Sequence, residues 1–399
     1  MPLSNTDRHY GAVAKTLHWS TALLILTLIP LGIFANDLPY DTSEELARKA
    51  WFFSLHKTLG VTVFFVALAR ILWAISQPKP AGLHPDRKFE TWAAQTVHWL
   101  LYGSLLLVPL SGWVHHASTA GFAPIWWPFG QNLPLVPKSE TLAATTAGLH
   151  LVFERVLVIS ILLHIAGALK HHIIDRDATL RRMLPGQPSV PDLRDGHKGV
   201  LPIVAALTVW AGALAIGSGL GVYQRHDSSV QAAALEAVQS DWAVQDGTLE
   251  ITVTQLGGPV TGSFSDWTAA ISFDEAVETG TAGSVEVIVS IGSLTLGSVT
   301  SEALGTDFFN AEAFPTAQFN ATIERGPDGY AAVGTLTIKD QTLPVTLPFT
   351  LDLAENVAAM QGGLTLDRRE FNIGNSQPDE GSLGFAVEVT VALTAVEGG

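Results

Sequence analysis

The stretch GLHLVFERVLVISILLHIAGALKHH, residues 148–172, decides the fold of this chain. It is long and apolar enough to cross a bilayer as one helix, yet it carries His150 and His164. With a rise of about 1.5 Å per residue, the two are about 21 Å apart along the axis and point from nearly the same face. Histidine is costly inside a bilayer unless it has a partner. The pair therefore predicts two stacked haems, each taking one axial ligand from this helix.

The composition limits how such a haem can be held. The 399 residues include no Cys, which excludes disulfides, thiolate-bound metal and the C-x-x-C-H attachment of c-type haem. The three methionines are Met1, Met183 and Met360, so no apolar run offers a methionine ligand. Any haem must therefore be non-covalent and held by histidine.

Four further apolar runs are long enough to cross a membrane. We expect spans near residues 17–36, 53–76, 94–114, 148–170 and 200–222. Lys and Arg gather in the N-terminal segment, in the 77–91 loop and in residues 171–199, where Arg194 and Lys198 lie. These segments should face the cytoplasm. The predicted location is a bacterial inner membrane, with a cytoplasmic N-terminus and the part after the fifth span in the periplasm.

Charge and periodicity divide the chain into parts of different character. Residues 1–239 carry 18 Lys and Arg against 15 Asp and Glu, whereas residues 240–399 carry 4 against 22, a net charge of −18. Apolar and polar residues alternate in the second part, which predicts about eight strands in an antiparallel barrel or sandwich. The expected domains are a four-helix transmembrane haem bundle at 1–190, a fifth transmembrane helix and connector at 191–240, and the β domain at 241–399.

Two more histidines complete the predicted haem sites. His18 begins the first span and His56 begins the second. Their expected depths pair His56 with His150 and His18 with His164. Two histidines leave no open position on the iron, which favours electron transfer over oxygen binding. The alternative is that each histidine is bonded to a backbone carbonyl near a helix end.

Other polar residues of the spans have two readings each. Arg70 either pairs with a haem propionate or extends to the interface, and His98 either lines a quinone or propionate site or bonds to the backbone. His171 and His172 follow the fourth span. They fit solvated surface histidines better than a proton relay to a quinone.

Residues 5–185 resemble the bacterial cytochrome b561 family of dihaem membrane proteins. The resemblance is carried by LHWS at 17–20, LHKTLG at 55–60, HWLLYGSLLLVPLSGW at 98–113 and ALKHHIIDRDATLRRMLPG at 168–186, with His150 and His164 between the last two. It implies two haem b groups, the same four axial histidines and contact with the ubiquinone pool. It also implies superoxide as the electron donor.

Residues 241–395 resemble the YceI-like family of periplasmic, lipocalin-like β-barrels. The segments that carry the resemblance are TDFFNAEAFPTAQFNATIE at 306–324, VGTLTIKDQTLPVTLPFTL at 333–351 and LTLDRREFNIG at 364–374. It implies an apolar interior that binds an isoprenoid chain, such as a quinone tail. The first hairpin lacks the histidine that the family often has there. The candidate lining residues, each of which could instead be ordinary core, are Phe264, Trp267, Phe308, Phe314, Phe319 and Phe371.

Three functions are compatible with these patterns. The leading hypothesis is a superoxide:quinone oxidoreductase in which electrons pass from the periplasmic side to ubiquinone. The second is a quinol-oxidising donor to a basic periplasmic cytochrome, and the third is a tethered isoprenoid carrier without catalysis. The expected partners are membrane lipid, a quinone, and superoxide or a periplasmic electron carrier, with no nucleic acid.

Overall fold

The computed structural model describes residues 2–40, 42–84, 86–119, 121–127, 130–190, 199–224, 231–236, 238–327, 329–354 and 356–398. The chain divides into two compact units. The helical unit comprises Met1–Leu38, Trp51–Thr119 and Pro124–Arg225, and the β unit comprises Pro39–Ala50, Ala120–Ala123 and His226–Gly399. Arg194, Lys198 and other parts of the expected fifth-helix and connector segment at 191–240 lie outside the described residues.

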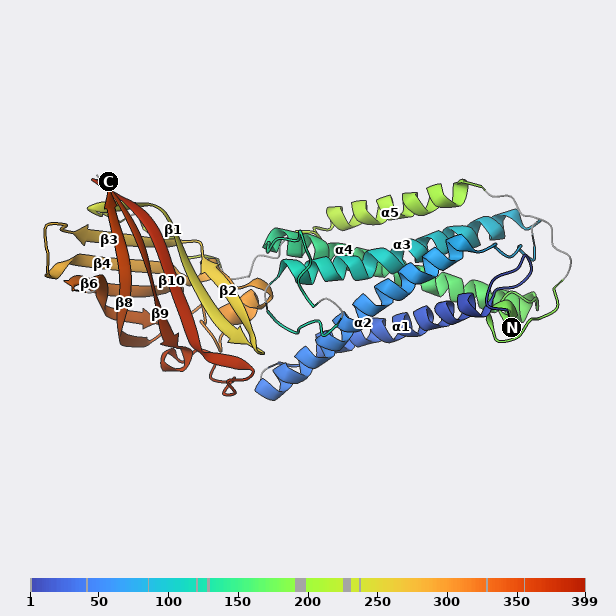
Figure 1. Ribbon diagram of the computed structural model, residues 1–399, viewed down its shortest axis with the longest axis horizontal. Coiled ribbons are helices and arrows are strands. Elements are labelled where there is room, and N and C mark those ends of the chain that lie inside the picture. The colour runs from blue at the N-terminus through green and yellow to red at the C-terminus, as the bar shows by residue number, and fades with distance from the viewer. Residues whose placement is uncertain are drawn as a thin grey trace. The chain divides into compact units, whose positions relative to one another are not determined.

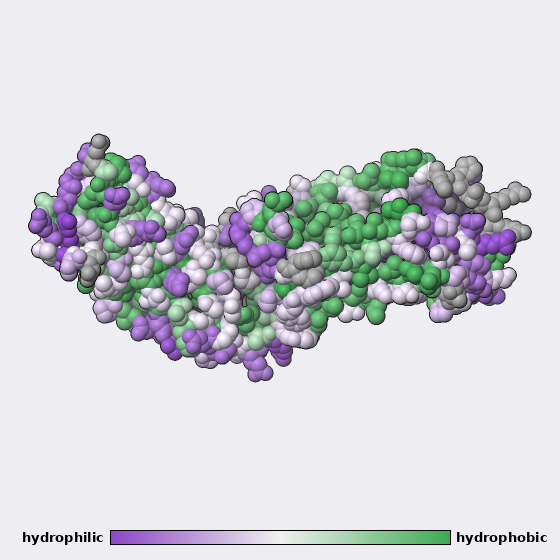
Figure 2. All heavy atoms as spheres, viewed as in Figure 1, coloured by the Kyte–Doolittle hydropathy of each residue, from purple (hydrophilic) through white to green (hydrophobic). Residues whose placement is uncertain are grey.

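Five helices of the described chain are long and apolar enough to cross a membrane, which confirms the predicted spans. They are α1 (Ala12–Asp37), α2 (Ser43–Ser76), α3 (Lys88–Ser118), α4 (Glu140–Leu169), which continues into the π-helix η1 (Lys170–Ile174), and α5 (Leu201–Gly219). Hydrophobic residues cover much of the visible surface of these helices (Figure 2), as the lipid-facing side of a bundle requires.

The first four helices begin before the apolar runs that predicted them. Helix α4 starts after Ser139, whose hydroxyl accepts a hydrogen bond from the Leu142 amide and caps the helix. Helix α2 starts with Glu44 and Glu45 in its first turn, where negative charge is favourable. Capping and the helix dipole thus extend both helices into polar sequence.

Helices α1 to α4 share one buried core. Its buried residues are Ile25, Leu28, Val63, Ala67, Leu105 and Leu157. Helix α5 packs beside α3 and α4 (Figure 1), where the ring of Trp210 contacts the edge of Phe153 at a centroid distance of 5.1 Å. The fifth helix therefore lies against the four-helix bundle and contributes nothing to its central core.

The β unit is one antiparallel sheet of ten strands in the described chain, in the order β3-β4-β6-β7-β8-β9-β10-β1-β2-β5. The strands are β1 (Trp242–Gln255), β2 (Gly258–Phe264), β3 (Trp267–Phe273), β4 (Gly280–Ser290), β5 (Leu294–Thr295), β6 (Thr316–Gly326), β7 (Gly329–Ile338), β8 (Gln341–Ala354), β9 (Val357–Asp367) and β10 (Leu383–Glu397). The alternation of apolar and polar residues thus predicted the strand class correctly, and the sheet has two more strands than expected.

The sheet curls into a half-barrel (Figure 1). The amide of Asp241, just before β1, donates to the carbonyl of Ile271 on β3, so one sheet edge returns to the beginning of β1. The ring of Trp267 lies over Gly247 on β1, where an added Cβ would meet it at 2.8 Å. The curl therefore depends on a glycine at the point where β3 approaches β1.

A buried arginine fixes the loop between β9 and β10. Arg368 lies in the short 3-10 helix η5 (Arg368–Phe371) and is 3% exposed. Its guanidinium donates to five backbone carbonyls, those of Ile373, Gly374, Gln377, Leu383 and Gly384. Burial lowers the pKa of this group from its ordinary value. One buried side chain thereby donates to five carbonyls around this loop, and the Gly374 carbonyl also accepts from the Gln377 amide.

Candidate functional site

A spacing of seven residues relates the residues inside the bundle on all four of its helices. Seven positions after each of His18, His56, His98 and His150 stands an aliphatic residue. Fourteen positions after them stand, in the same order, Gly32, Arg70, Gly112 and His164. The four aliphatic residues form what we call the aliphatic layer: Ile25, Val63, Leu105 and Leu157. All four belong to the shared core of the bundle and are between 3% and 8% exposed.

One polar layer lies on each side of the aliphatic layer. We call them the His18 layer (His18, Arg70, His98 and His164) and the His56 layer (Gly32, His56, Gly112 and His150). Seven residues of helix correspond to about 10 Å of rise. The repeat therefore places the two histidine levels on opposite sides of the aliphatic layer, about 10 Å from it along the helices.

The structure brings the members of the His18 layer together. The rings of His18 and His164 have centroids 6.1 Å apart and are tilted by 57°. Arg70 donates from Nη2 to Nδ1 of His18 over 3.0 Å. His98 meets the edge of the His164 ring at 5.1 Å, and its own Nδ1 lies 2.7 Å from the Ala94 carbonyl. His98 thus makes the backbone bond that one of its two readings expected.

In the His56 layer each histidine is bonded to a neighbouring helix. Nδ1 of His56 donates to the Leu28 carbonyl of α1 over 3.2 Å, and Nδ1 of His150 donates to the Val108 carbonyl of α3 over 2.8 Å. Because a carbonyl can only accept, Nδ1 carries the proton in both rings. Nε2 of each ring is then the free lone pair that a metal can bind.

Two glycines make room for these rings, and sequence reasoning missed both. A Cβ on Gly32 would lie 2.8 Å from Cε1 of His56, and a Cβ on Gly112 would lie 3.0 Å from Nδ1 of His150. Each glycine follows by four residues the carbonyl that accepts the hydrogen bond. The available signal was spacing, since Gly32 and Gly112 stand fourteen residues after His18 and His98.

The six aromatic residues predicted to line an isoprenoid site have different environments. Phe264 belongs to a packed core with Ile251, Val253 and Leu294, and Phe371 is 1% exposed. The other four, which are partly buried, are Trp267, Phe308, Phe314 and Phe319. The isoprenoid site formed by these six residues stays a prediction.

A row of aromatic rings outside this predicted set connects the strands β1, β3, β7 and β8. Tyr330 stacks on Phe349 at 5.6 Å and 19°, and Phe273 contacts Tyr330 and Trp242 by its edge. Leu351 and Leu353 pack nearby and remain partly exposed. The cross-strand pairing of Tyr330 with Phe349 creates this row, and sequence alone does not give that register.

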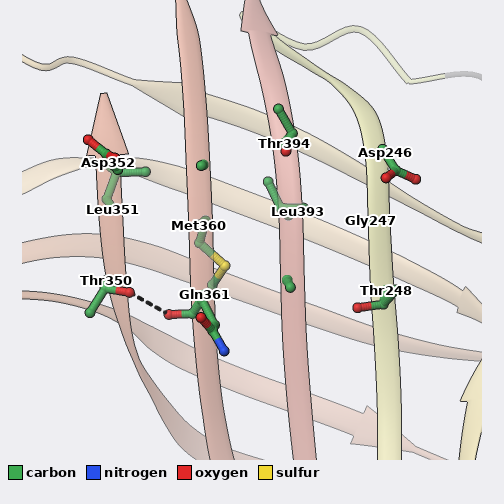
Figure 3. Close-up of a pocket in the computed structure, with 12 residues that line it drawn as sticks. Asp246, Gly247, Thr248, Thr350, Leu351, Asp352, Met360, Gln361, Leu393 and Thr394 are labelled. Carbon is green, nitrogen blue, oxygen red and sulfur yellow. Dashed lines mark hydrogen bonds between the residues drawn. The ribbon is translucent and has the colours of Figure 1, made fainter. Parts of the chain in front are cut away.

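A pocket opens on the strands β8, β9, β10 and β1 (Figure 3). Half of its twelve lining residues are polar, namely Asp246, Thr248, Thr350, Asp352, Gln361 and Thr394, and Leu351, Met360 and Leu393 are among the others. Thr350 donates to the Gln361 carbonyl across two of its strands. None of the predicted isoprenoid-lining residues contributes to this pocket.

A membrane-spanning bundle joined to a curled β-sheet agrees with the comparisons to known proteins. Residues 9–186 match the family described as prokaryotic cytochrome b561, and residues 237–395 match the YceI-like domain. The protein is accordingly a membrane oxidoreductase with a second, YceI-like domain. The chain belongs to the cytochrome b561 family.

Individual relatives cover one unit each. The chain is 30% identical over 192 residues to cytochrome b561 homolog 2 of Escherichia coli K12, which spans 46% of this chain and 95% of that protein. It is 25% identical over 179 residues to the probable superoxide oxidase CybB of Yersinia pestis, over 45% of this chain and 97% of that protein. The crystal structure of BcnA from Burkholderia cenocepacia covers 38% of this chain and 96% of its own, with 27% identity and a TM-score of 0.36.

The family implies haem b, and the bundle contains residues that fit it. With metal–imidazole bonds of about 2 Å, two rings on opposite sides of one metal have centroids about 6 Å apart. The His18 and His164 rings are 6.1 Å apart. His56 and His150 already have the tautomer that leaves Nε2 free. His18 does not, because its Nδ1 accepts from Arg70, so binding through Nε2 requires Arg70 to turn away.

Proposed function

We propose that this protein is a superoxide:quinone oxidoreductase that holds two haem b groups, one in each polar layer. His18 and His164 are the proposed ligands of one haem, and His56 and His150 of the other. A haem with two histidine ligands supplies one-electron transfer without an open position on the iron. The single observation that carries the proposal is the seven-residue repeat, which sets two histidine levels on either side of the aliphatic layer.

The proposed reaction balances as one two-electron reduction. Two superoxide anions lose one electron each and become two molecules of oxygen, and one ubiquinone takes two electrons and two protons to become ubiquinol. The name of the Yersinia pestis relative supports superoxide as the donor. We place the His56 layer at the periplasmic side and the His18 layer at the cytoplasmic side of the inner membrane, because basic residues gather in the N-terminal segment and the loop before α3.

The protein side chains have separate roles in this proposal. The Leu28 and Val108 carbonyls orient the His56 and His150 rings through Nδ1, and orienting bonds of this kind tune a ligand and fix its tautomer. Arg70, once turned from His18, is the proposed partner of a haem propionate. Its cation also lies over the ring of Tyr102 at 5.5 Å, which holds the guanidinium near this layer.

For the β unit we propose the binding of an isoprenoid chain, such as a quinone tail. The inward side chains of β8, among them Leu343, Val345 and Leu351, are apolar and only partly buried. Covering such surface contributes about 25 cal/mol per Å². The aromatic row of Tyr330 and Phe349 extends this apolar surface.

One observation favours the second candidate function, a quinol-oxidising donor to a periplasmic cytochrome. Residues 240–399 have a net charge of −18 from 4 Lys and Arg against 22 Asp and Glu. A field of that sign attracts a basic protein and slows an anion such as superoxide. In this alternative, electrons leave ubiquinol and pass outward.

The deciding experiment mixes the oxidised, haem-loaded full chain with superoxide in a stopped-flow spectrometer. We expect fast haem reduction that superoxide dismutase abolishes, followed by reoxidation when ubiquinone is present. Haems that stay oxidised with superoxide but are reduced by ubiquinol and oxidised by a basic cytochrome would establish the outward direction instead. A chain ending at residue 224 serves as a control, and an unchanged rate there would show that the β unit has a separate role.

The ligand assignment predicts which variants lose haem. His56→Ala and His18→Ala should each bind one haem per chain where the natural protein binds two, as counted by pyridine haemochromogen absorbance. His172→Ala, at an exposed histidine beyond α4, is the matched control and should keep both. If His56→Ala and His150→Ala both retained two haems, the proposed ligands would be wrong.

A further inference from the structure

Three residues beyond the two polar layers bring metal-binding atoms together in the helical unit. His84 precedes α3, His171 lies in η1 at the end of α4, and Asp177 follows η1. Nε2 of His84 is 2.9 Å from Oδ2 of Asp177, and Nδ1 of His171 is 2.7 Å from the same oxygen. The two imidazole rings stack, with centroids 5.9 Å apart and planes 12° apart.

Local backbone structure holds this arrangement. The helix changes from α to π at residues 170–174, and short π segments occur often at functional sites. Arg176 then has a left-handed conformation with φ of +54°, which turns the chain between Asp175 and Asp177. The Thr179 amide donates to Oδ1 of Asp177 over 2.7 Å, so the carboxylate is fixed with Oδ2 toward the two histidines.

In the described part of the chain, the Asp177 carboxylate has no ion pair with Lys or Arg, so its charge is available to a bound cation. The neighbouring carboxylates of Asp175 and Glu90 are paired with Lys170 and Arg87, and Oδ2 of Asp175 also lies 3.1 Å from Nδ1 of His171. Within the described part of the chain, the ion pairs of Asp177 are those with His84 and His171.

We propose that His84, His171 and Asp177 bind a Zn²⁺ ion, with solvent in the fourth position. Two imidazole nitrogens and one carboxylate oxygen form a donor set that suits zinc, whereas magnesium and calcium prefer oxygen alone. The three donor atoms lie within 4.8 Å of one another. Ligands of one tetrahedral zinc are about 3.3 Å apart, so the two contacts to Asp177 open by about half an ångström when the ion enters.

The proposed ion ties two segments of the helical unit. His84 belongs to the segment between α2 and α3, and its side chain is 31% exposed, so it can adjust to the ion. His171 stands seven residues after His164, about 10 Å further along the axis. A bound zinc would therefore fix the loop before α3 to the end of α4 beside the His18 layer. This inference does not depend on the direction of electron transfer.

The test measures zinc binding by the full, haem-loaded chain in detergent after removal of metal with EDTA. Zn²⁺ is titrated in competition with a fluorescent zinc chelator. His84→Ala and the nearly isosteric Asp177→Asn should each weaken the affinity by at least about tenfold. His172→Ala removes an exposed neighbouring histidine and should leave the affinity unchanged. An unchanged haem spectrum shows that each variant is folded.

Zinc-edge X-ray absorption gives an independent readout, because haem iron does not contribute at that edge. We expect the scattering pattern of two imidazoles in the natural protein and of one in His84→Ala. Affinity that survives in both site variants, or that is lost in His172→Ala, would show adventitious surface binding and overturn the proposal. A spectrum without imidazole scattering would do the same.

Discussion

At the scale of single residues, the hydrogen bonds of Nδ1 decide what each histidine can bind. His56 and His150 donate from Nδ1 to carbonyls of neighbouring helices, so their Nε2 atoms are lone pairs. His18 has the opposite arrangement, because Arg70 donates to its Nδ1. The histidines of the His56 layer can therefore bind a metal through Nε2 as they stand. In the His18 layer, the Arg70 side chain must first move away from His18.

The fit of a ring against a glycine leads to a prediction for Gly32→Ala. The new Cβ would lie 2.8 Å from Cε1 of His56, so the ring has to shift or tilt. Strain of about 1–3 kcal/mol is typical of overpacking. It corresponds to about a 5- to 140-fold loss of affinity for the haem that His56 is proposed to hold. Competitive transfer of haem to an acceptor protein measures this loss.

Gly60→Ala is the matched control for that measurement. Gly60 lies in α2 close to His56, and an added Cβ there would meet nothing within 4 Å. We expect its haem affinity to equal that of the natural protein. Equal losses in the two variants would mean that the effect comes from helix propensity and not from contact with the ring.

At the scale of elements, hydropathy and periodicity predicted the five spans and the strand-rich part, because both depend on local sequence. Where the helices begin was less accessible, since it depends on Ser139 as a cap and on Glu44 and Glu45 in the first turn of α2. The aromatic row of Tyr330 and Phe349 was also missed, because it depends on strand register. Register is set by long-range pairing and turn geometry, which a single strand does not show.

In the candidate site, too, one part could be predicted from local sequence and the other part required the structure. The spacing of the four histidines suffices to propose ligands, since an α-helix converts spacing into depth and direction. The roles of Gly32, Gly112 and the Leu28 carbonyl are contacts between different helices, and they appear only when the bundle is assembled. The zinc-binding set at His171 was read as a solvated surface because its partners lie in other segments of the chain.

Arg368 provides a prediction for the elements β9 and β10. Arg368→Ala removes the guanidinium donor from five backbone carbonyls, of which Gly374 keeps the Gln377 amide, and buried unsatisfied groups cost about 1–3 kcal/mol each. We expect hydrogen exchange in β10 to accelerate by at least about a hundredfold, equal to about 3 kcal/mol of opening free energy. Hydrogen-exchange mass spectrometry of Leu383–Glu397 measures it.

The adjacent Arg369 is the control for this prediction. Its side chain is 52% exposed, pairs with Asp367 and lies over the ring of Phe385 on β10 at 3.8 Å. An exposed ion pair and an exposed cation–π contact each contribute about 1 kcal/mol or less, so Arg369→Ala should change the exchange of β10 far less than Arg368→Ala. If both variants exchanged at the natural rate, the carbonyls around Arg368 would have found other partners, and the guanidinium would not be what fixes this loop.

At the scale of the whole molecule, the chain combines one unit whose surface suits lipid with one part whose charged surface suits water. The helical unit exposes apolar residues such as Leu23, Leu162 and Leu207 for contact with lipid. The part from residue 240 onward concentrates the negative charge of the protein, with 22 of its 37 acidic residues. A basic partner would therefore bind this part less tightly as salt is added, whereas the haem-binding bundle lies in a medium that salt does not screen.

The seven-residue repeat also limits how the length of this protein can vary. One residue inserted between His150 and His164 would rotate His164 by about 100° and move it out of its layer. A deletion would do the same in the opposite sense, and no change in a neighbouring side chain could restore the direction. The loops between the helices carry no such restriction. Insertions and deletions should therefore accumulate between the helices, while the fourteen-residue intervals inside α1, α2, α3 and α4 stay constant in length.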